Sequence, residues 1–149
     1  MKEKDLKVKA VGRGYQVFYK GERCKYIGSG ISRRVYKTPD EQWVVKVEDT
    51  SFSEQTQDEY ANYKRLKRRI PQHLPVTKKP FSKEGLLIGL QEYIPGKKYN
   101  SLRGKVRRSV KDQYTHLEEK TGVSDLHGGN LVYNEKRGCL VIVDLGDGV

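Results

Sequence analysis

The residues of this chain best suited to chemistry lie in its last quarter, in a polar turn that contains Asp125 and Asn130 and in a second turn that opens with Asp144. Two short apolar runs, Leu131 to Tyr133 and Cys139 to Val143, separate these turns and flank a turn-rich stretch. Runs of this kind pair as a β-hairpin, which would bring the two turns side by side. Carboxylate and amide oxygens are ligands that Mg²⁺ prefers, and a further carboxylate could act as a base. The pattern therefore predicts a magnesium and nucleotide site.

A second group of candidate residues lies in the first third of the chain, where residues 1–50 alternate and turn as a small antiparallel sheet would. Gly28 and Gly30 fall where one strand reverses into the next, and such glycines let backbone N–H groups approach phosphate oxygens. Lys46 interrupts an apolar run, so strand alternation points it away from Val45 and Val47. A lysine placed there needs a carboxylate or a phosphate. An ordinary hairpin turn remains the alternative for the glycine pair. The expected strands are 15–19, 23–27, 35–37 and 43–47.

Glu59 is the carboxylate predicted to meet Lys46. Ser51 and Glu54 have the spacing of a capping box, so a helix is expected to begin there and to run to about Arg69, before a proline. On this helix Glu59 falls within the apolar stripe. An acid in the core-facing stripe, on the helix that follows the lysine strand, is the natural partner of Lys46. A salt bridge or cap at the rim of the helix is the alternative.

The second half of the chain is expected to contain a buried strand over 86–94, ended by Pro95 and Gly96, and a long helix over 101–120 that Gly122 ends. Seven basic residues and no acidic one lie between positions 97 and 111, so this face could meet phosphate or an acidic protein, although plain solvation also accounts for it. The apolar stripe of the helix consists of Leu102, Val106, Val110, Tyr114 and Leu117.

Composition limits the class of protein. The 149 residues suit one domain, and a net charge of +11 favours an acidic partner such as nucleic acid, an anionic membrane or an acidic protein. Cys24 and Cys139 lack metal-ligand spacing and are expected to be reduced core residues. The sequence shows no signal peptide and no run long enough to span a membrane, which predicts a cytoplasmic protein, of the producing cell or of a host cell if it is injected.

These pieces in this order resemble the protein kinase-like fold: Gly28-x-Gly30, Lys46 on a strand, Glu59 on the next helix, a strand into Glu92-Tyr93, a long helix, then D-L-H-G-G-N and D-L-G. The chain is similar over about residues 24–148 to compact branches of that superfamily, such as aminoglycoside- and lipopolysaccharide-kinase-like proteins and phage-encoded relatives. The resemblance implies one α+β domain. It would have an N-lobe (about 1–93) of antiparallel sheet and one αC-type helix, a hinge (about 91–96), and a reduced C-lobe (about 97–149) of one main helix and a catalytic β-hairpin.

The resemblance also implies a role for each candidate residue. Asp125 would orient and deprotonate the acceptor hydroxyl, Lys46 would hold the α- and β-phosphates of ATP, and Glu59 would fix Lys46. Asn130 and Asp144 would hold Mg²⁺. Arg33 stands where the family's loop has its third glycine, and it could touch phosphate itself. The nucleotide would be bound by Gly28, Ser29, Gly30, Arg33, Val35 and Lys46 at its phosphates, and by the backbone of Glu92, Tyr93 and Ile94 at its adenine.

The sequence given ends at Val149, before the activation segment that the family normally carries. This layout resembles minimal effector kinases that some bacteria inject into host cells, which rely on a host ubiquitin-conjugation complex. We therefore expect an ATP- and Mg²⁺-dependent serine/threonine protein kinase that could phosphorylate itself. An acidic or ubiquitin-system protein is an expected partner, and the acceptor would be positioned by another surface such as 97–111. The alternatives are a nucleotide-binding pseudokinase, which the Val123-Ser124 pair before Asp125 favours because the family has a histidine there, and a basic nucleic-acid-binding domain.

Overall fold

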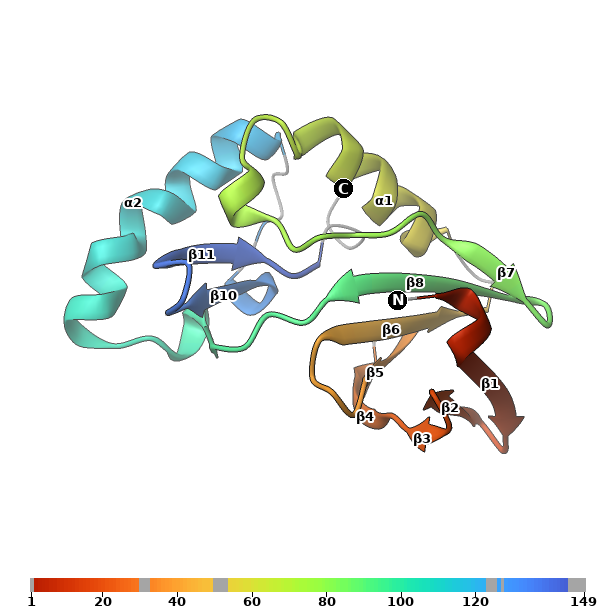
Figure 1. The fold of residues 1–149 in the computed structure, drawn as a ribbon. Helices are drawn as coiled ribbons and strands as arrows, with labels where there is room; N and C mark the ends of the chain where they lie inside the picture. Colours follow the sequence, from red (N-terminus) through yellow and green to blue (C-terminus); the bar gives the residue numbers. More distant parts are fainter. Residues whose placement is uncertain (1, 30–32, 50–53, 123–125, 127, 145–149) are drawn as a thin grey trace. The chain divides into compact units, whose positions relative to one another are not determined.

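The computed structural model describes residues 2–29, 33–49, 54–122, 126 and 128–144. Contacts divide the chain into an N-terminal unit, residues 1–56 with 77–93, and a C-terminal unit, residues 57–76 with 94–149. Figure 1 shows strands gathered in the first unit and the helix α2 beside a hairpin in the second. The described residues form an α+β fold of antiparallel sheets and two α-helices, as predicted.

The larger sheet of the N-terminal unit has the strand order β4-β5-β6-β8-β7, and every neighbouring pair is antiparallel. The strand β6 occupies the middle, and its residues from Val44 to Glu48 are all buried. The strand is therefore covered on both faces, although two of these buried residues, Lys46 and Glu48, are charged. The bounds are β4 Lys25–Ser29, β5 Arg33–Lys37, β6 Trp43–Glu48, β7 Phe81–Lys83 and β8 Leu86–Glu92.

A smaller antiparallel sheet, β1 (Leu6–Val11), β2 (Gly14–Tyr19) and β3 (Glu22–Arg23), precedes the larger one. The predicted strand 23–27 is therefore wrong as one element: the chain is divided at Cys24 between two sheets. The two sheets share one apolar cluster, to which β1 and β2 contribute Leu6, Val8 and Val17, and the larger sheet contributes Val45, Val47, Ile88 and Leu90. Neither β1 nor the short β7 was predicted from the sequence.

Helix α1 (Gln55–Leu66) is shorter than predicted. Glu54 lies before the helix and is exposed, so it does not occupy the third helical position that the predicted capping box requires, while Ser51 lies outside the described residues. At the other end, the N–H groups of Arg69 and Ile70 both donate to the Leu66 carbonyl oxygen, at 2.9 and 3.0 Å, which closes the helix in a turn. Ile70 has left the helical region (φ −134°, ψ 51°), as residues before proline commonly do.

The C-terminal unit is built on the predicted hairpin, which is confirmed. The strands β10 (Leu131–Asn134) and β11 (Cys139–Ile142) are antiparallel, with Leu131 opposite Ile142 and Asn134 opposite Cys139. A short strand, β9 (Lys97–Lys98), adds to β10. The predicted buried strand 86–94 ends earlier, at Glu92. The short 3-10 helices of this unit are η2 (Pro71–His73), η3 (Tyr99–Ser101) and η4 (Gly128–Asn130). The core of the unit includes Leu66, Ile70, Tyr99, Val110, Leu117, Leu131, Leu140 and Ile142.

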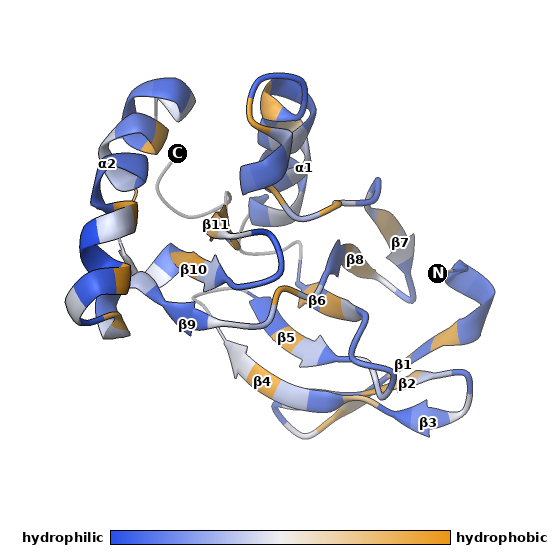
Figure 2. Cartoon of the chain, turned by 60° about the vertical axis from the view of Figure 1, so that its left-hand side comes forward, coloured by the Kyte–Doolittle hydropathy of each residue, from blue (hydrophilic) through white to orange (hydrophobic). Residues whose placement is uncertain are grey.

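Helix α2 (Gly104–Thr121) lies along the hairpin (Figure 1), and the side-chain oxygen of Gln113 accepts a hydrogen bond of 2.9 Å from the Leu140 N–H. Gly122 ends the helix in the left-handed conformation (φ 68°) with its N–H on the Glu118 carbonyl, as predicted. Figure 2 shows α2 as mostly hydrophilic with separate hydrophobic bands. One member of the predicted stripe is wrong: Val106 is 41% exposed, because the core covers the helix only from Val110 onward.

The two cysteines are free and buried, as predicted. Within the described residues, no helix combines the length and the apolar character that crossing a bilayer requires.

Candidate functional site

The register of the larger sheet aligns several of the predicted nucleotide-binding residues in one row. Gly28 on β4 lies opposite Val35 on β5, Val35 lies opposite Lys46 on β6, and Lys46 lies opposite Gly89 on β8. Directly opposite residues of antiparallel strands point to the same face of the sheet. The face that carries Lys46 is therefore the face of Gly28 and Val35, and Val45 and Val47 point to the other face, in the apolar cluster.

Gly89 is a member of this row that the sequence reasoning missed. A Cβ atom at Gly89 would lie 2.9 Å from Cγ2 of Thr56 and 3.7 Å from Cβ of Lys46. The missing side chain thus lets the first turn of α1 approach the sheet next to the lysine. A single glycine inside an apolar strand was the available signal, since such glycines mark close approach of a neighbouring element.

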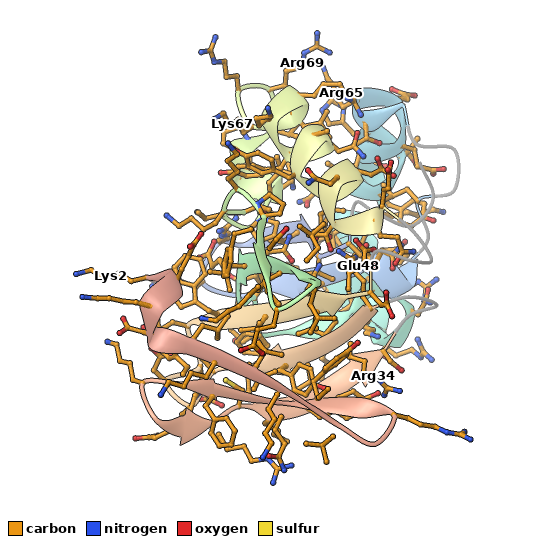
Figure 3. The ribbon with its side chains drawn as sticks, turned by 90° about the vertical axis from the view of Figure 1, so that its right-hand side faces the viewer. Lys2, Arg34, Glu48, Arg65, Lys67 and Arg69 are labelled. Carbon is orange, nitrogen blue, oxygen red and sulfur yellow. The ribbon has the colours of Figure 1, made fainter. Side chains whose placement is uncertain are left out.

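Glu48, also missed, is the second charged residue of β6, and it is fully buried. Two residues after Lys46, it points to the same face. Its carboxylate accepts hydrogen bonds from the N–H groups of Gln55 (2.9 Å) and Thr56 (3.2 Å), the first residues of α1. Figure 3 shows Glu48 next to this first turn. Glu48 therefore caps the helix, in the role that the sequence assigned to Ser51.

Arg33 lies directly opposite Glu48 in the register and is 4% exposed. The sheet therefore sets a buried cation opposite the buried carboxylate that caps α1. The predicted contact of Arg33 with phosphate stays a prediction. Of the other predicted loop residues, Ser29 is the exposed last residue of β4, and Gly30 lies outside the described residues.

The predicted adenine-binding segment lies where the chain leaves β8. Glu92 is opposite Trp43, and the Tyr93 N–H donates to the Gln42 carbonyl oxygen at 2.9 Å. The Nζ atom of Lys37 lies 4.9 Å from the centre of the Tyr93 ring. Ile94 belongs to the C-terminal unit, where it packs with Val132 and Val141.

The hairpin brings the two predicted magnesium ligands to one end. Asn130 directly precedes β10, and Asp144 is the second residue after β11. The Val143 N–H donates to the Asn130 carbonyl oxygen at 2.9 Å, so the pairing of the hairpin continues to this point. An amide oxygen and a carboxylate at the same end form a donor set whose chemistry fits Mg²⁺. No group of three or more His, Cys, Asp or Glu side chains within the described residues offers another metal site.

The loop that leads into Asn130 is fixed by close contacts. The Tyr114 hydroxyl donates to the carbonyl oxygen of the buried Leu126 at 2.5 Å. A Cβ atom at Gly128 would lie 2.1 Å from Oδ1 of Asn100 and 2.9 Å from Cδ1 of Tyr99, so a larger residue there would have to displace these side chains. Asp125, the predicted base, lies outside the described residues.

Glu59 is 2% exposed on α1, in agreement with its place in the apolar stripe. It belongs to the C-terminal unit, whereas Lys46 belongs to the N-terminal unit. The pairing of Glu59 with Lys46 stays a prediction.

The cysteines offer no alternative chemistry. Burial, with the Asp40 carboxylate as a smaller cause, raises the pKa of the Cys24 thiol from 9.0 to about 11, and burial also raises the pKa of Cys139. The thiolate is the reactive form, so neither residue is a candidate nucleophile or metal ligand.

The fold is similar to that of a solved protein. The structure of WbdD in a co-crystal with the kinase inhibitor LY294002 matches with a TM-score of 0.53 and 15% sequence identity, over 88% of this chain and 34% of the WbdD chain. At this identity the likeness shows the fold, and the α+β architecture is compatible with a kinase-like fold. The chain spans about a third of the length of that solved chain. No protein family and no curated protein matches the sequence.

Proposed function

We propose that this protein is a phosphotransferase that uses ATP and Mg²⁺, of the serine/threonine protein kinase type. The observation that carries the proposal is the row across the larger sheet, in which Gly28, Val35 and the buried Lys46 share one face, in a fold similar to that of WbdD. An ammonium group donates charge-assisted hydrogen bonds to phosphate oxygens, and the phosphates of a nucleotide would be such acceptors.

Each residue has a proposed task in phosphoryl transfer, which depends on positioning and charge neutralisation. Lys46 donates hydrogen bonds to phosphate oxygens, and Glu59 holds the ammonium group in place. Asn130 and Asp144 would hold Mg²⁺, which would neutralise the negative charge of the phosphates, and ATP would supply the phosphoryl group. Asp125 accepts the proton of the acceptor hydroxyl as that oxygen bonds to the γ-phosphorus, while the bond from the γ-phosphorus to the leaving ADP oxygen breaks.

The backbone near the end of β8 would recognise adenine. Since the Tyr93 N–H already donates to Gln42, a hydrogen bond from adenine to Tyr93 would use its carbonyl oxygen. The carbonyl oxygen accepts from an exocyclic amine, which fits the amino group of adenine. The proposal therefore favours ATP over GTP.

Transfer of labelled phosphate from ATP tests the proposal, with the protein itself and a generic protein as acceptors. Lys46→Met and Asp125→Ala are expected to lower the rate by about 100-fold or more, the usual loss on removing one group that stabilises a transition state. Lys9→Met, which removes an exposed cation on β1, is the matched control and is expected to keep the wild-type rate.

The outcomes separate the candidate functions. Wild-type incorporation no greater than that of Asp125→Ala, with thermal stabilisation by magnesium-ATP intact, would replace the kinase by a nucleotide-binding pseudokinase. The missing histidine before Asp125 is the feature that favours this second function. Absence of both transfer and nucleotide stabilisation would overturn both, and salt-sensitive binding to DNA or RNA would then support a nucleic-acid-binding domain.

A further inference from the structure

A groove of about 680 Å³ lies entirely within the C-terminal unit, and its lining residues are different from those assigned to phosphoryl transfer. Its walls come from the segment before and within β9, from the residues that lead into α2 and the first turn of that helix, and from the end of β10 with the turn that follows it. We call it the basic groove. The residues that give it its chemistry are Lys97, Leu102, Arg103, Val106, Glu135 and Lys136.

The walls of the basic groove are fixed to one another. The Asn134 Nδ2 group donates to the Pro95 carbonyl oxygen at 2.9 Å, and Asn134 Oδ1 accepts from the Arg137 N–H at 2.9 Å. Gly96 has φ 145°, and a Cβ atom there would lie 2.0 Å from the Tyr133 carbonyl oxygen, so the backbones meet in close contact. A groove built in this way keeps its shape before a ligand arrives, which lowers the entropic cost of binding.

The apolar part of the groove is formed by the exposed Val106 and by the buried Leu102. A valine that is 41% exposed on a helix would be unremarkable alone. Here it lines a concave site, where an apolar side chain of a ligand could displace water from it.

The groove also has cations among its lining residues. Lys97, Arg103 and Lys136 are exposed lining residues, and Glu135 is the acid among the lining residues that the structure describes. Arg103 is already positioned: its Nη1 group donates to the carbonyl oxygens of Asn100 (2.9 Å) and Leu102 (2.8 Å). A guanidinium group has five donors, so this arrangement leaves others able to bind a carboxylate.

We propose that the basic groove binds an extended segment of a partner protein in which an apolar residue is flanked by aspartate or glutamate. The apolar side chain would pack on Val106, and the flanking carboxylates would meet Lys97, Arg103 and Lys136. The charge of the groove disfavours a basic segment, and its apolar lining residues distinguish it from a surface that binds only phosphate. This binding does not depend on phosphotransferase activity.

A library of fluorescent 12-residue peptides tests the proposal with the full chain. Each peptide carries one central leucine, isoleucine, valine or phenylalanine among aspartate, glutamate, serine and glycine, and paired peptides carry a central alanine or replace the acids by lysine. Acidic peptides with an apolar centre are expected to bind, with at least about a tenfold weaker affinity after the alanine change, which corresponds to losing a buried aliphatic side chain. The lysine peptides are expected not to bind.

Matched variants locate the binding site. Arg103→Glu combined with Lys136→Glu is expected to abolish binding, whereas Lys7→Glu combined with Lys9→Glu, which changes two exposed lysines of β1 by the same charge, is expected to keep most of it. Val106→Asp is expected to weaken binding at least tenfold, and Val11→Asp, at a valine that is 45% exposed, is its control. Melting temperatures within a few degrees of wild type show that each variant is folded.

Three results would overturn the proposal. The first is that no peptide of the library binds more tightly than the lysine peptides. The second is an equal loss of binding in the groove variants and in the β1 variants, which would mean that net charge alone is responsible. The third is that single-stranded RNA binds the same cations more tightly than any peptide and is insensitive to Val106→Asp, which would make the groove a nucleic-acid site.

Discussion

Replacing Glu48 by alanine is expected to destabilise the protein more than any other single change to an acid of the N-terminal unit. The carboxylate is fully buried, accepts the N–H groups of Gln55 at 2.9 Å and Thr56 at 3.2 Å, and lies opposite Arg33. Hydrogen bonds to a charged group contribute about 1.5–3 kcal/mol each, and loss of a helix cap costs about 0.5–2 kcal/mol.

An opposing effect must be weighed, because alanine also removes the cost of keeping a carboxylate out of water. That relief is small here, since the N–H groups and the positive end of the α1 dipole stabilise the charge, and the substitution leaves the donors of α1 without this acceptor. We expect a net loss of about 3 kcal/mol, which for a chain of this size lowers the melting temperature by about 6–12 °C. Glu48→Gln keeps one acceptor oxygen but loses the charge, and about half of this loss is expected for it.

Chemical and thermal denaturation, followed by circular dichroism, measure these losses. Glu54→Ala is the matched control, because Glu54 is an exposed acid directly before the same helix and its removal changes the net charge equally. Surface substitutions commonly change the free energy of unfolding by up to about 0.5 kcal/mol. If the losses for Glu48→Ala and Glu54→Ala differed by no more than this, the capping argument would be refuted.

Two other features give predictions that do not involve the helix cap. Gly128→Ala would place a Cβ atom 2.1 Å from Oδ1 of Asn100, and this overpacking is expected to lower the free energy of unfolding by about 1–3 kcal/mol. Adding Asn100→Ala is expected to recover most of that loss in a double-mutant cycle. Additive losses from the two substitutions would contradict the steric argument. In the folded protein the pKa of the Cys24 thiol is raised from 9.0 to about 11, so the unfolded chain loses this proton at lower pH. The free energy of unfolding is therefore expected to fall as pH rises from 9 to 11. For the same reason, Cys24 of the folded protein is expected to react slowly with iodoacetamide at pH 8. The contribution is measured as the difference in free energy of unfolding between wild type and Cys24→Ala at each pH. If this difference stayed constant from pH 9 to 11, the thiol would not titrate as expected.

Local pattern was sufficient to predict the elements whose apolar residues follow one period. The β10–β11 hairpin, β6, β8 and the end of α2 at Gly122 all lie close to their predicted positions, because turn residues and apolar runs bound them in the sequence. The burial of Lys46 and of Glu59 was predictable in the same way, because strand periodicity places the first residue and helix periodicity places the second.

Features that depend on distant contacts were not predictable. In strand β1 the buried Leu6 and Val8 alternate with the exposed Lys7 and Lys9, and this short alternation stands out only when β2 pairs with it. Val106 continues the helical stripe in the sequence, yet the core reaches α2 only from Val110 onward. The helix cap was also misassigned, since Glu48 reaches α1 from the end of β6, and a capping box considers residues within one helical turn.

The strand β6 explains why this fold can hold polar groups near its core. Alternation divides the strand into two sets: Val45 and Val47 enter the apolar cluster, and Lys46 and Glu48 point to the opposite face. The valines secure the strand by apolar burial, so the charged residues need not stabilise it and can serve other tasks. One of these tasks, the capping of α1, is structural, and the other, at Lys46, is the binding of phosphate that we propose. The strand thereby fixes the first residues of α1 through the same backbone that positions Lys46.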